Sequence, residues 1–299
     1  MSSRTVMRRA PAQREMGGLT TGTIGCFPLI ACTFFVALVT GSTDLLAEDT
    51  LPSAEEMATI VERGREIAGY ERAAIGATDL LLAGKPDYSR MDLYVAVHTD
   101  QRWRVYFGKL DDSGNRFLIA YAYACSDEVC QEIKSMPNSE PAHMDLPPLA
   151  RAVKLASKSF EADSQLTYNT NVFREPDSSI TVYVTPGSTT PETVLLGGDF
   201  KISISPDGTQ VLKNVKLHNT VLRFSSSDIP EGARGVSALH SHVRSDLPTE
   251  TDVAHVLLHP KELAPHIVIG QTFTSEIAAD GHITVKRREP VVNHQDRGS

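Results

Sequence analysis

Apolar residues after about position 50 recur every three to four positions, which is the spacing of one face of a helix. The segment 51–82 shows this spacing, and Ser53 followed by Glu56 forms a capping box that predicts where the helix begins. A second helix is predicted over 71–82. Alternating apolar and polar residues then predict three strands in meander order, at 93–98, 102–109 and 116–124, and a short helix at 127–133.

Strand-like and helical runs alternate in the second half of the chain. A helix is predicted over 149–160, with Pro148 as its first residue, and a second helix starts at Thr249 and stops at Pro260. Strands are predicted at 180–184, 192–204, 211–224 and 235–239, with a last hairpin of 265–277 and 283–287. The pattern predicts an α+β fold, with N-terminal helices on a small antiparallel sheet and a mixed sheet in the C-terminal part.

A turn-rich stretch, 136–141, divides the chain into two predicted modules. We expect an N-terminal α/β module over 48–140 and a second domain over 148–288. Residues 289–299 are polar and are predicted to be a flexible tail.

The first 47 residues have the features of a secretory signal peptide. Four arginines precede the apolar run 24–39, and small residues followed by Leu45-Leu46-Ala47 predict cleavage near Ala47. The alternative is an uncleaved anchor, although the apolar run is shorter than the roughly 20 residues of a spanning helix. We therefore expect an exported protein, periplasmic or extracellular, that meets a membrane only through this segment.

The charge of the chain excludes one class of partner. The net charge is −8, and residues 1–47 carry four arginines and two acidic residues, so the mature chain would have a net charge of −10. Nucleic acid binding requires a basic face to meet the phosphate backbone. We therefore expect no nucleic acid partner.

Cysteine usage fits an oxidising compartment. Of four cysteines, only Cys125 and Cys130 would remain after removal of the signal peptide. Two cysteines in an exported domain favour one disulfide bond over a metal site, because a metal site would need a second pair.

The residues that the sequence marks as candidate metal ligands are His240, His242 and Asp252. The two histidines follow a strand-like run and alternate along it, so both side chains would point to the same side. Thr249 is a predicted helix cap, which places Asp252 in the first turn of the next helix. Two imidazoles and a carboxylate, with water in a fourth position, are typical of catalytic zinc sites. The sequence therefore predicts one Zn²⁺ ion at these three residues.

At these residues the chain resembles the JAMM/MPN metalloprotease family, over roughly residues 190–285. The match is His240-Ser241-His242, six residues, Thr249, two residues and Asp252. The resemblance implies that the histidines and the aspartate bind zinc and that Thr249 stands where the family has a serine that helps stabilise the oxyanion. The spacer is one residue shorter than in the family, and Val243 replaces the usual proline.

The resemblance also implies a carboxylate that acts as general base through the metal-bound water. Glu192, just before Thr193-Val194-Leu195-Leu196-Gly197, has the look of that residue, and Asp199 is a rival that follows two glycines. A third alternative is that neither acts as the base. The implied function is an exported zinc-dependent hydrolase of a peptide or isopeptide bond in an unknown peptide or protein substrate. The alternative is a non-catalytic envelope or periplasmic protein, for binding or interaction, that retains the fold.

Two further histidines lie in the helix after Asp252. His255 and His259 are four residues apart and so share a helical face. They are either a second pair of ligands or, for the histidine before Pro260, a C-terminal helix cap.

Overall fold

The computed structural model describes residues 51–127, 129–133, 145–188, 190, 193–225 and 237–289. Within these residues the protein is α+β, as predicted, with four α-helices, antiparallel sheets and one mixed sheet. Among these helices, none has both the length and the apolar character that crossing a bilayer requires. The predicted signal segment, the turn-rich stretch 136–141 and Glu192 lie outside the described residues.

The N-terminal helical region is one helix, α1 (Ala54–Ala83), rather than the two predicted. Ser53 caps it as predicted, because its side chain accepts a hydrogen bond of 3.1 Å from the Glu56 amide. The prediction of two helices is wrong because glycines within the run do not end the helix and instead allow close packing. A Cβ atom at Gly64 would lie 2.6 Å from the Val253 side chain, so this glycine permits close contact with helix α3 (Glu250–Leu258).

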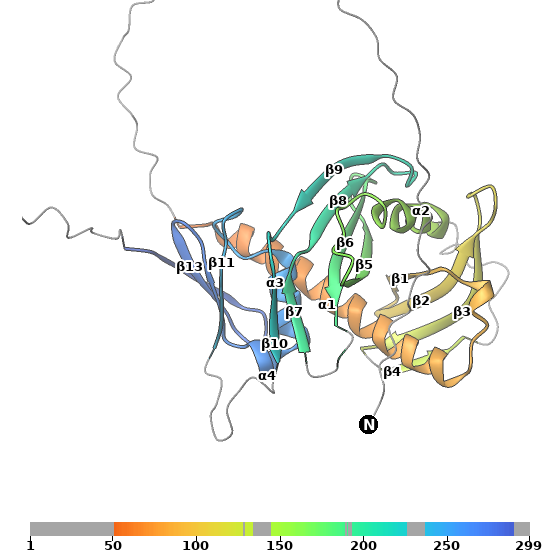
Figure 1. Ribbon diagram of the computed structural model, residues 1–299, viewed down its shortest axis with the longest axis horizontal. Helices are drawn as coiled ribbons and strands as arrows, with labels where there is room; N and C mark the ends of the chain where they lie inside the picture. Colours follow the sequence, from red (N-terminus) through yellow and green to blue (C-terminus); the bar gives the residue numbers. More distant parts are fainter. Residues whose placement is uncertain are drawn as a thin grey trace, which may run out of the picture. The chain divides into compact units, whose positions relative to one another are not determined.

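The first sheet is an antiparallel meander packed against the second half of α1 (Figure 1). Its strands are β1 (Leu93–Thr99), β2 (Arg102–Leu110), β3 (Phe117–Ser126) and β4 (Val129–Glu132), and the three-residue helix η1 (Tyr88–Arg90) precedes them. The first three strands were predicted. The predicted helix at 127–133 is wrong, because Asp127 turns the chain with a φ of 51° and β4 then pairs with β3.

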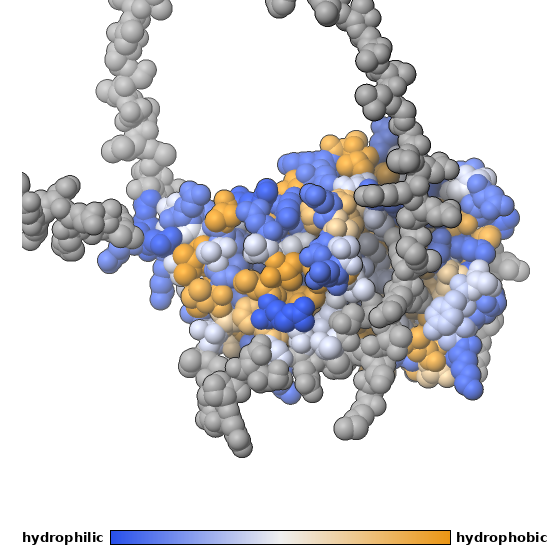
Figure 2. All heavy atoms as spheres, in the orientation of Figure 1, coloured by the Kyte–Doolittle hydropathy of each residue, from blue (hydrophilic) through white to orange (hydrophobic). Residues whose placement is uncertain are grey.

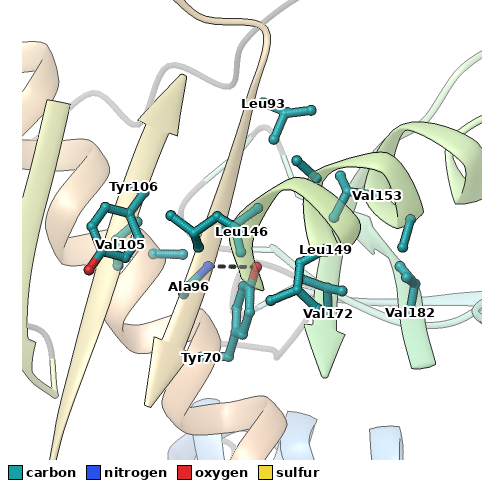
Figure 3. Packing of buried hydrophobic residues seen from close by; sticks show 14 of the residues in the cluster. Tyr70, Leu93, Ala96, Val105, Tyr106, Leu146, Leu149, Val153, Val172 and Val182 are labelled. Atoms are coloured by element: carbon teal, nitrogen blue, oxygen red, sulfur yellow. Dashed lines mark hydrogen bonds between the residues drawn. The ribbon is translucent and has the colours of Figure 1, made fainter. Parts of the chain in front are cut away.

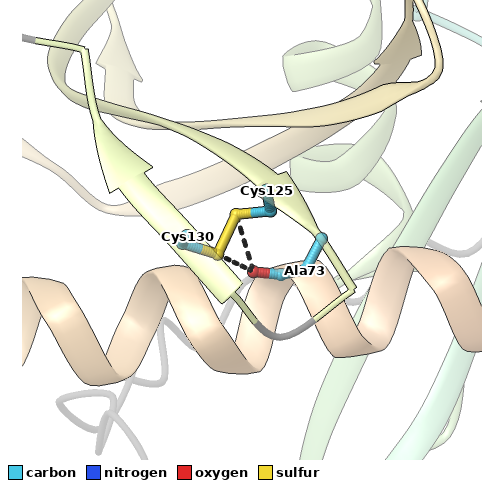
Figure 4. The surroundings of a disulfide bond; sticks show 3 residues. All are labelled: Ala73, Cys125 and Cys130. Carbon is cyan, nitrogen blue, oxygen red and sulfur yellow. Dashed lines mark hydrogen bonds between the residues drawn. A yellow bond between two sulfur atoms is a disulfide. The ribbon is translucent and has the colours of Figure 1, made fainter.

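Cys125 and Cys130 form a disulfide bond, as predicted, with sulfur atoms 2.03 Å apart. The two residues face each other directly across β3 and β4. Both sulfur atoms lie 3.6 Å from the carbonyl oxygen of Ala73 in α1 (Figure 4). The bond therefore holds the edge strand β4 to β3 at the place where both strands meet the helix.

Removal of this disulfide is expected to have a modest effect. The two cysteines are only five positions apart, and a bridge that closes so short a loop contributes on the order of 2 kcal/mol in the chain-entropy model. Urea unfolding of Cys125→Ser/Cys130→Ser should show a loss of about this size. A variant as stable as the wild type would contradict a stabilising role for the bridge.

The main hydrophobic core crosses the predicted boundary between modules. Figure 3 shows Tyr70 of α1, with Val105 and Tyr106 of β2, beside side chains from helix α2 (Leu146–Ala156). The Tyr70 hydroxyl accepts a hydrogen bond of 3.0 Å from the Ala96 amide within this core. One connected cluster of buried side chains includes residues from both sides of the turn-rich stretch 136–141. That stretch therefore does not separate two hydrophobic cores.

The remaining strands form two sheets and a strand pair, and two predicted strands are broken. The bounds are β5 (Thr167–Arg174), β6 (Ile180–Gly187), β7 (Thr193–Gly197), β8 (Phe200–Ile204), β9 (Val211–Lys216) and β10 (Val221–Ser225). The predicted strand 192–204 breaks after Gly197, so that β7 pairs with β10 whereas β8 pairs with β6 and β9. The predicted strand 211–224 breaks between β9 and β10. Each predicted strand is therefore divided between two sheets.

The last sheet is mixed. It contains β11 (Ala238–Ser241), β12 (His266–Ile269), β13 (Phe273–Ile277) and β14 (Ile283–Arg287), and only β11 and β12 are parallel. The predicted strand 265–277 is a hairpin of β12 and β13. Pro260 ends α3 as predicted but also begins the short helix α4 (Pro260–Leu263).

Strand β9 is a free edge of the sheet β5-β6-β8-β9 in the part of the chain that the structure describes. Hydrophobic colour lies over this strand in Figure 2, and Val211 and Leu212 are exposed there. Lys213 and Lys216 are on the same strand, and lysines on an edge discourage pairing with other chains.

Candidate metal centre

Four side chains converge at one point between β11, α3 and the β9–β10 connection. They are His218, His240, His242 and Asp252, and the ligand atoms that they offer all lie within 4.8 Å of one another. The three residues predicted from the sequence are therefore together, and His218 is a fourth that the sequence reasoning missed.

Several distances between these atoms lie near those of a four-coordinate metal ion. The Nε2 atoms of His218 and His242 are 2.9 Å apart. The Asp252 carboxylate lies 3.2 Å from His218 Nε2, 3.5 Å from His240 Nε2 and 3.3 Å from His242 Nε2. Ligand atoms of a tetrahedral zinc ion, each roughly 2.0–2.2 Å from the metal, lie about 3.3–3.6 Å apart. The Asp252 distances lie close to this range, whereas the His218–His242 contact is shorter and the four ligand atoms spread over as much as 4.8 Å, so the rings would shift to hold such an ion.

Alternation along β11 explains why two of the histidines share a side. His240 and His242 are 6% and 5% exposed, whereas Leu239 between Ala238 and His240 is 53% exposed. In a strand, successive side chains point to opposite faces, so the two imidazoles point inward together. The amide of His242 also donates a 2.8 Å hydrogen bond to Ile269 of β12, which fixes the strand end.

A capping box holds Asp252 in place at the start of α3. The Thr249 amide and hydroxyl donate to the Asp252 carboxylate at 2.7 and 2.8 Å, and the Asp252 amide donates back to the Thr249 hydroxyl at 3.3 Å. Thr249 is thus the helix cap that the sequence predicts. In the described structure its hydroxyl is engaged with Asp252, so Thr249 supports a ligand.

Each histidine of the cluster has a partner on its outer ring nitrogen. His218 Nδ1 lies 2.5 Å from an Asp199 oxygen, His240 Nδ1 lies 2.7 Å from His266 Nε2, and His242 Nδ1 lies 2.9 Å from the Leu247 carbonyl oxygen. A carboxylate only accepts hydrogen bonds, so His218 carries a proton on Nδ1; His242 Nδ1 also lies 2.7 Å from the Ser245 hydroxyl. Partners on the outer nitrogens orient the rings so that the Nε2 atoms face the centre, the arrangement of metal-ligating histidines.

The buried carboxylates of Asp252 and Asp199 favour a positive charge among the ligand atoms. Burial lowers the pKa of His218, but the Asp252 and Asp199 carboxylates outweigh burial and raise that pKa to about 11. Burial would raise the pKa of Asp252, but the charge of His218 and hydrogen bonds from histidines hold it well below its usual range. Without a metal, a proton on His218 supplies this charge. A metal ion would replace that proton.

A buried ring nitrogen of His240 also indicates that a cation could bind here. Burial lowers its pKa to about 4, so its ring is neutral. Its Nε2 atom is buried and has no hydrogen-bond partner among the described residues, and one Asp252 oxygen has only the 3.2 Å ion pair with His218. Buried polar atoms are rarely left unpaired in native proteins. Both atoms face the place where a metal ion would bind.

The two candidates for the general base are placed differently. Asp199 is fully buried and binds His218 on one oxygen and the Thr251 hydroxyl on the other. It is therefore an outer partner of a ligand rather than a free carboxylate. Glu192 lies outside the described residues.

The other acidic and histidine residues nearby are outside the cluster. Asp246 accepts a 2.6 Å hydrogen bond from the Thr272 amide, and Glu250 forms a 2.6 Å ion pair with Lys201. His255 is buried, and its two ring nitrogens have no hydrogen-bond partner among the described residues. His259 ends α3, where its amide bonds to the His255 carbonyl.

Comparison of the chain with protein-family models, curated proteins and solved structures gave no match.

Proposed function

We propose that this protein binds one zinc ion in a centre that four protein ligands close: His218, His240, His242 and Asp252. The observation that carries the proposal is the convergence of four ligand atoms within 4.8 Å of one another, with a buried His240 Nε2 that has no hydrogen-bond partner among the described residues. In the metal-free protein the proton on His218 bridges the 2.9 Å to His242 Nε2, and a metal ion would take its place.

The donor set favours zinc among biological metals. Three imidazole nitrogens and one carboxylate oxygen are ligands that Zn²⁺ accepts in tetrahedral geometry, and the cluster contains no sulfur. When four protein groups fill the coordination sphere, the ion contributes binding energy to the fold. The ligands come from three separate segments of the chain, namely the β9–β10 connection, the end of β11 and the start of α3, so this energy would hold those segments together.

A JAMM-like hydrolase of peptide or isopeptide bonds is the second candidate. The convergence of His240, His242 and Asp252 favours it, because these are the ligands that the resemblance implies. Hydrolysis would need an open coordination position, which His218 fills in the proposed centre, and a free carboxylate as base. Asp199 is engaged with His218, so Glu192 is the remaining carboxylate for that role.

Cobalt substitution tests the closed centre against the open one. Co²⁺ with four protein ligands should give the strong visible absorption of tetrahedral cobalt, and added azide or acetohydroxamate should leave the spectrum unchanged. An open centre would bind these small ligands, and its spectrum would shift. A shift in the wild type would overturn the closed centre in favour of the hydrolase.

We further propose that the protein is exported and that residues 1–47 are removed. The disulfide bond between Cys125 and Cys130 supports this, because such bonds persist in oxidising compartments. The intact mass of protein isolated from the cell envelope should lack the first 47 or so residues. A full-length mass in the membrane fraction would instead indicate an anchor.

A further inference from the structure

We propose that Asp199 is the residue that positions His218 as the fourth metal ligand and thereby closes the centre. The inference rests on the proposed zinc site and adds what decides its coordination number. Asp199 would not touch the metal but would act through the ring of His218.

Two glycines before Asp199 allow the backbone to bring its side chain to His218. Gly197 and Gly198 precede it with φ angles of 80° and 69°, a conformation that side chains other than glycine rarely adopt. A Cβ atom at Gly197 would lie 2.5 Å from the Thr220 carbonyl oxygen. The two glycines let the chain reverse beside the β9–β10 connection and turn Asp199 inward, where it is fully buried.

Asp199 holds the segment that carries His218 through one side-chain and one backbone hydrogen bond. One carboxylate oxygen lies 2.5 Å from His218 Nδ1, and the Asp199 carbonyl oxygen accepts a 2.9 Å hydrogen bond from the Leu217 amide. The second carboxylate oxygen accepts a hydrogen bond from Thr251 of α3. Asp199 thus joins the His218 segment to the helix that carries Asp252.

A carboxylate on the outer nitrogen of a histidine ligand fixes both its tautomer and its orientation. Loss of such a partner typically weakens metal binding 10–100-fold. Asp199→Asn keeps the size of the side chain and one acceptor oxygen but removes the charge. This variant should therefore bind one zinc ion per chain, about 10–100-fold more weakly than the wild type.

A double-mutant cycle separates positioning from a general structural role. Zinc affinity is measured by competition with a chromophoric chelator in the wild type, Asp199→Asn, His218→Ala and the double variant. If Asp199 acts through His218, Asp199→Asn should change affinity by less than about twofold once His218 is absent. The same loss in both backgrounds, or wild-type affinity in Asp199→Asn, would overturn the proposal.

Two further variants complete the experiment. Glu71→Gln is a matched control, because Glu71 is also a buried acid, with a 2.9 Å hydrogen bond to Asn171, outside the centre. It should bind zinc with wild-type affinity. Should Asp199→Asn fail to fold, Thr251→Val removes the hydroxyl that donates to Asp199; because this hydroxyl also lies 2.9 Å from the Thr249 hydroxyl, the variant is compared with and without His218. It should weaken zinc binding only while His218 is present, and an equal loss without His218 would overturn the proposal. A wild type that binds no zinc would instead contradict the metal site itself.

Discussion

Replacement of Asp252 by alanine is expected to abolish zinc binding and to lower the free energy of unfolding by about 3–5 kcal/mol, the range for breaking a buried ion pair. Asp252 is fully buried and lies 3.2–3.5 Å from all three histidines. The substitution removes a proposed metal ligand, the counter-charge of His218 and the acceptor for Thr249 at the start of α3. Zinc content and urea unfolding measure the two effects.

Glu250→Ala is the matched control for this substitution. Glu250 is another acidic residue of the first turn of α3, but its carboxylate pairs with Lys201 and accepts a hydrogen bond from the Tyr183 hydroxyl. Its loss should leave zinc binding unchanged and should destabilise the protein less, because the Lys201 side chain is 36% exposed. Equal zinc content in Asp252→Ala and Glu250→Ala would contradict the assignment of Asp252 as a ligand.

Removal of zinc by a chelator is expected to lower the melting temperature by about 10 °C. A ligand present at a thousand times its dissociation constant stabilises the native state by about 4 kcal/mol. For a domain of 150–250 residues, each kcal/mol shifts the melting temperature by about 2–4 °C. Thermal unfolding followed by circular dichroism, with and without the chelator, measures this shift.

The same chelator should not affect a variant that has lost the site. His240→Ala/His242→Ala lacks two of the four ligands, so its melting temperature should already be low and should not respond to zinc or chelator. A wild type whose melting temperature is the same with and without zinc would contradict a role for the ion in holding the fold.

Local patterns predicted the parts of the fold in which one short segment determines the outcome. The meander β1–β3 follows from alternating residues, and Ser53 and Thr249 mark the starts of their helices. His240, His242 and Asp252 could be predicted as a group for the same reason. They come from a strand and the helix that follows it, within thirteen consecutive residues.

The sequence reasoning failed where the chain leaves one sheet for another. The runs 192–204 and 211–224 look like continuous strands because their apolar residues continue through the breaks. Each run is divided between two sheets, and the breaks carry the residues whose roles were not predicted. Asp199 lies in the first break and His218 in the second. Tertiary pairing determines both breaks, and no local period signals it.

Signals for these two residues were present but weak. The pair Gly197-Gly198 indicated that the chain turns or comes close to another segment before Asp199. His218 stands 22 positions before His240 in sequence, too far for a spacing motif to connect them. A histidine inside a run that reads as a strand gives no indication of its partners. The partner of His218 is evident only in the structure, where its Nε2 atom lies 2.9 Å from Nε2 of His242.

Zinc content of the purified protein tests the metal centre most directly. We expect one zinc ion per chain in the wild type and in Glu71→Gln, and none in His240→Ala/His242→Ala. Native mass spectrometry, supported by elemental analysis, gives the stoichiometry for each protein. Equal zinc occupancy in the wild type and in His240→Ala/His242→Ala would contradict the metal centre and, with it, the hydrolase alternative.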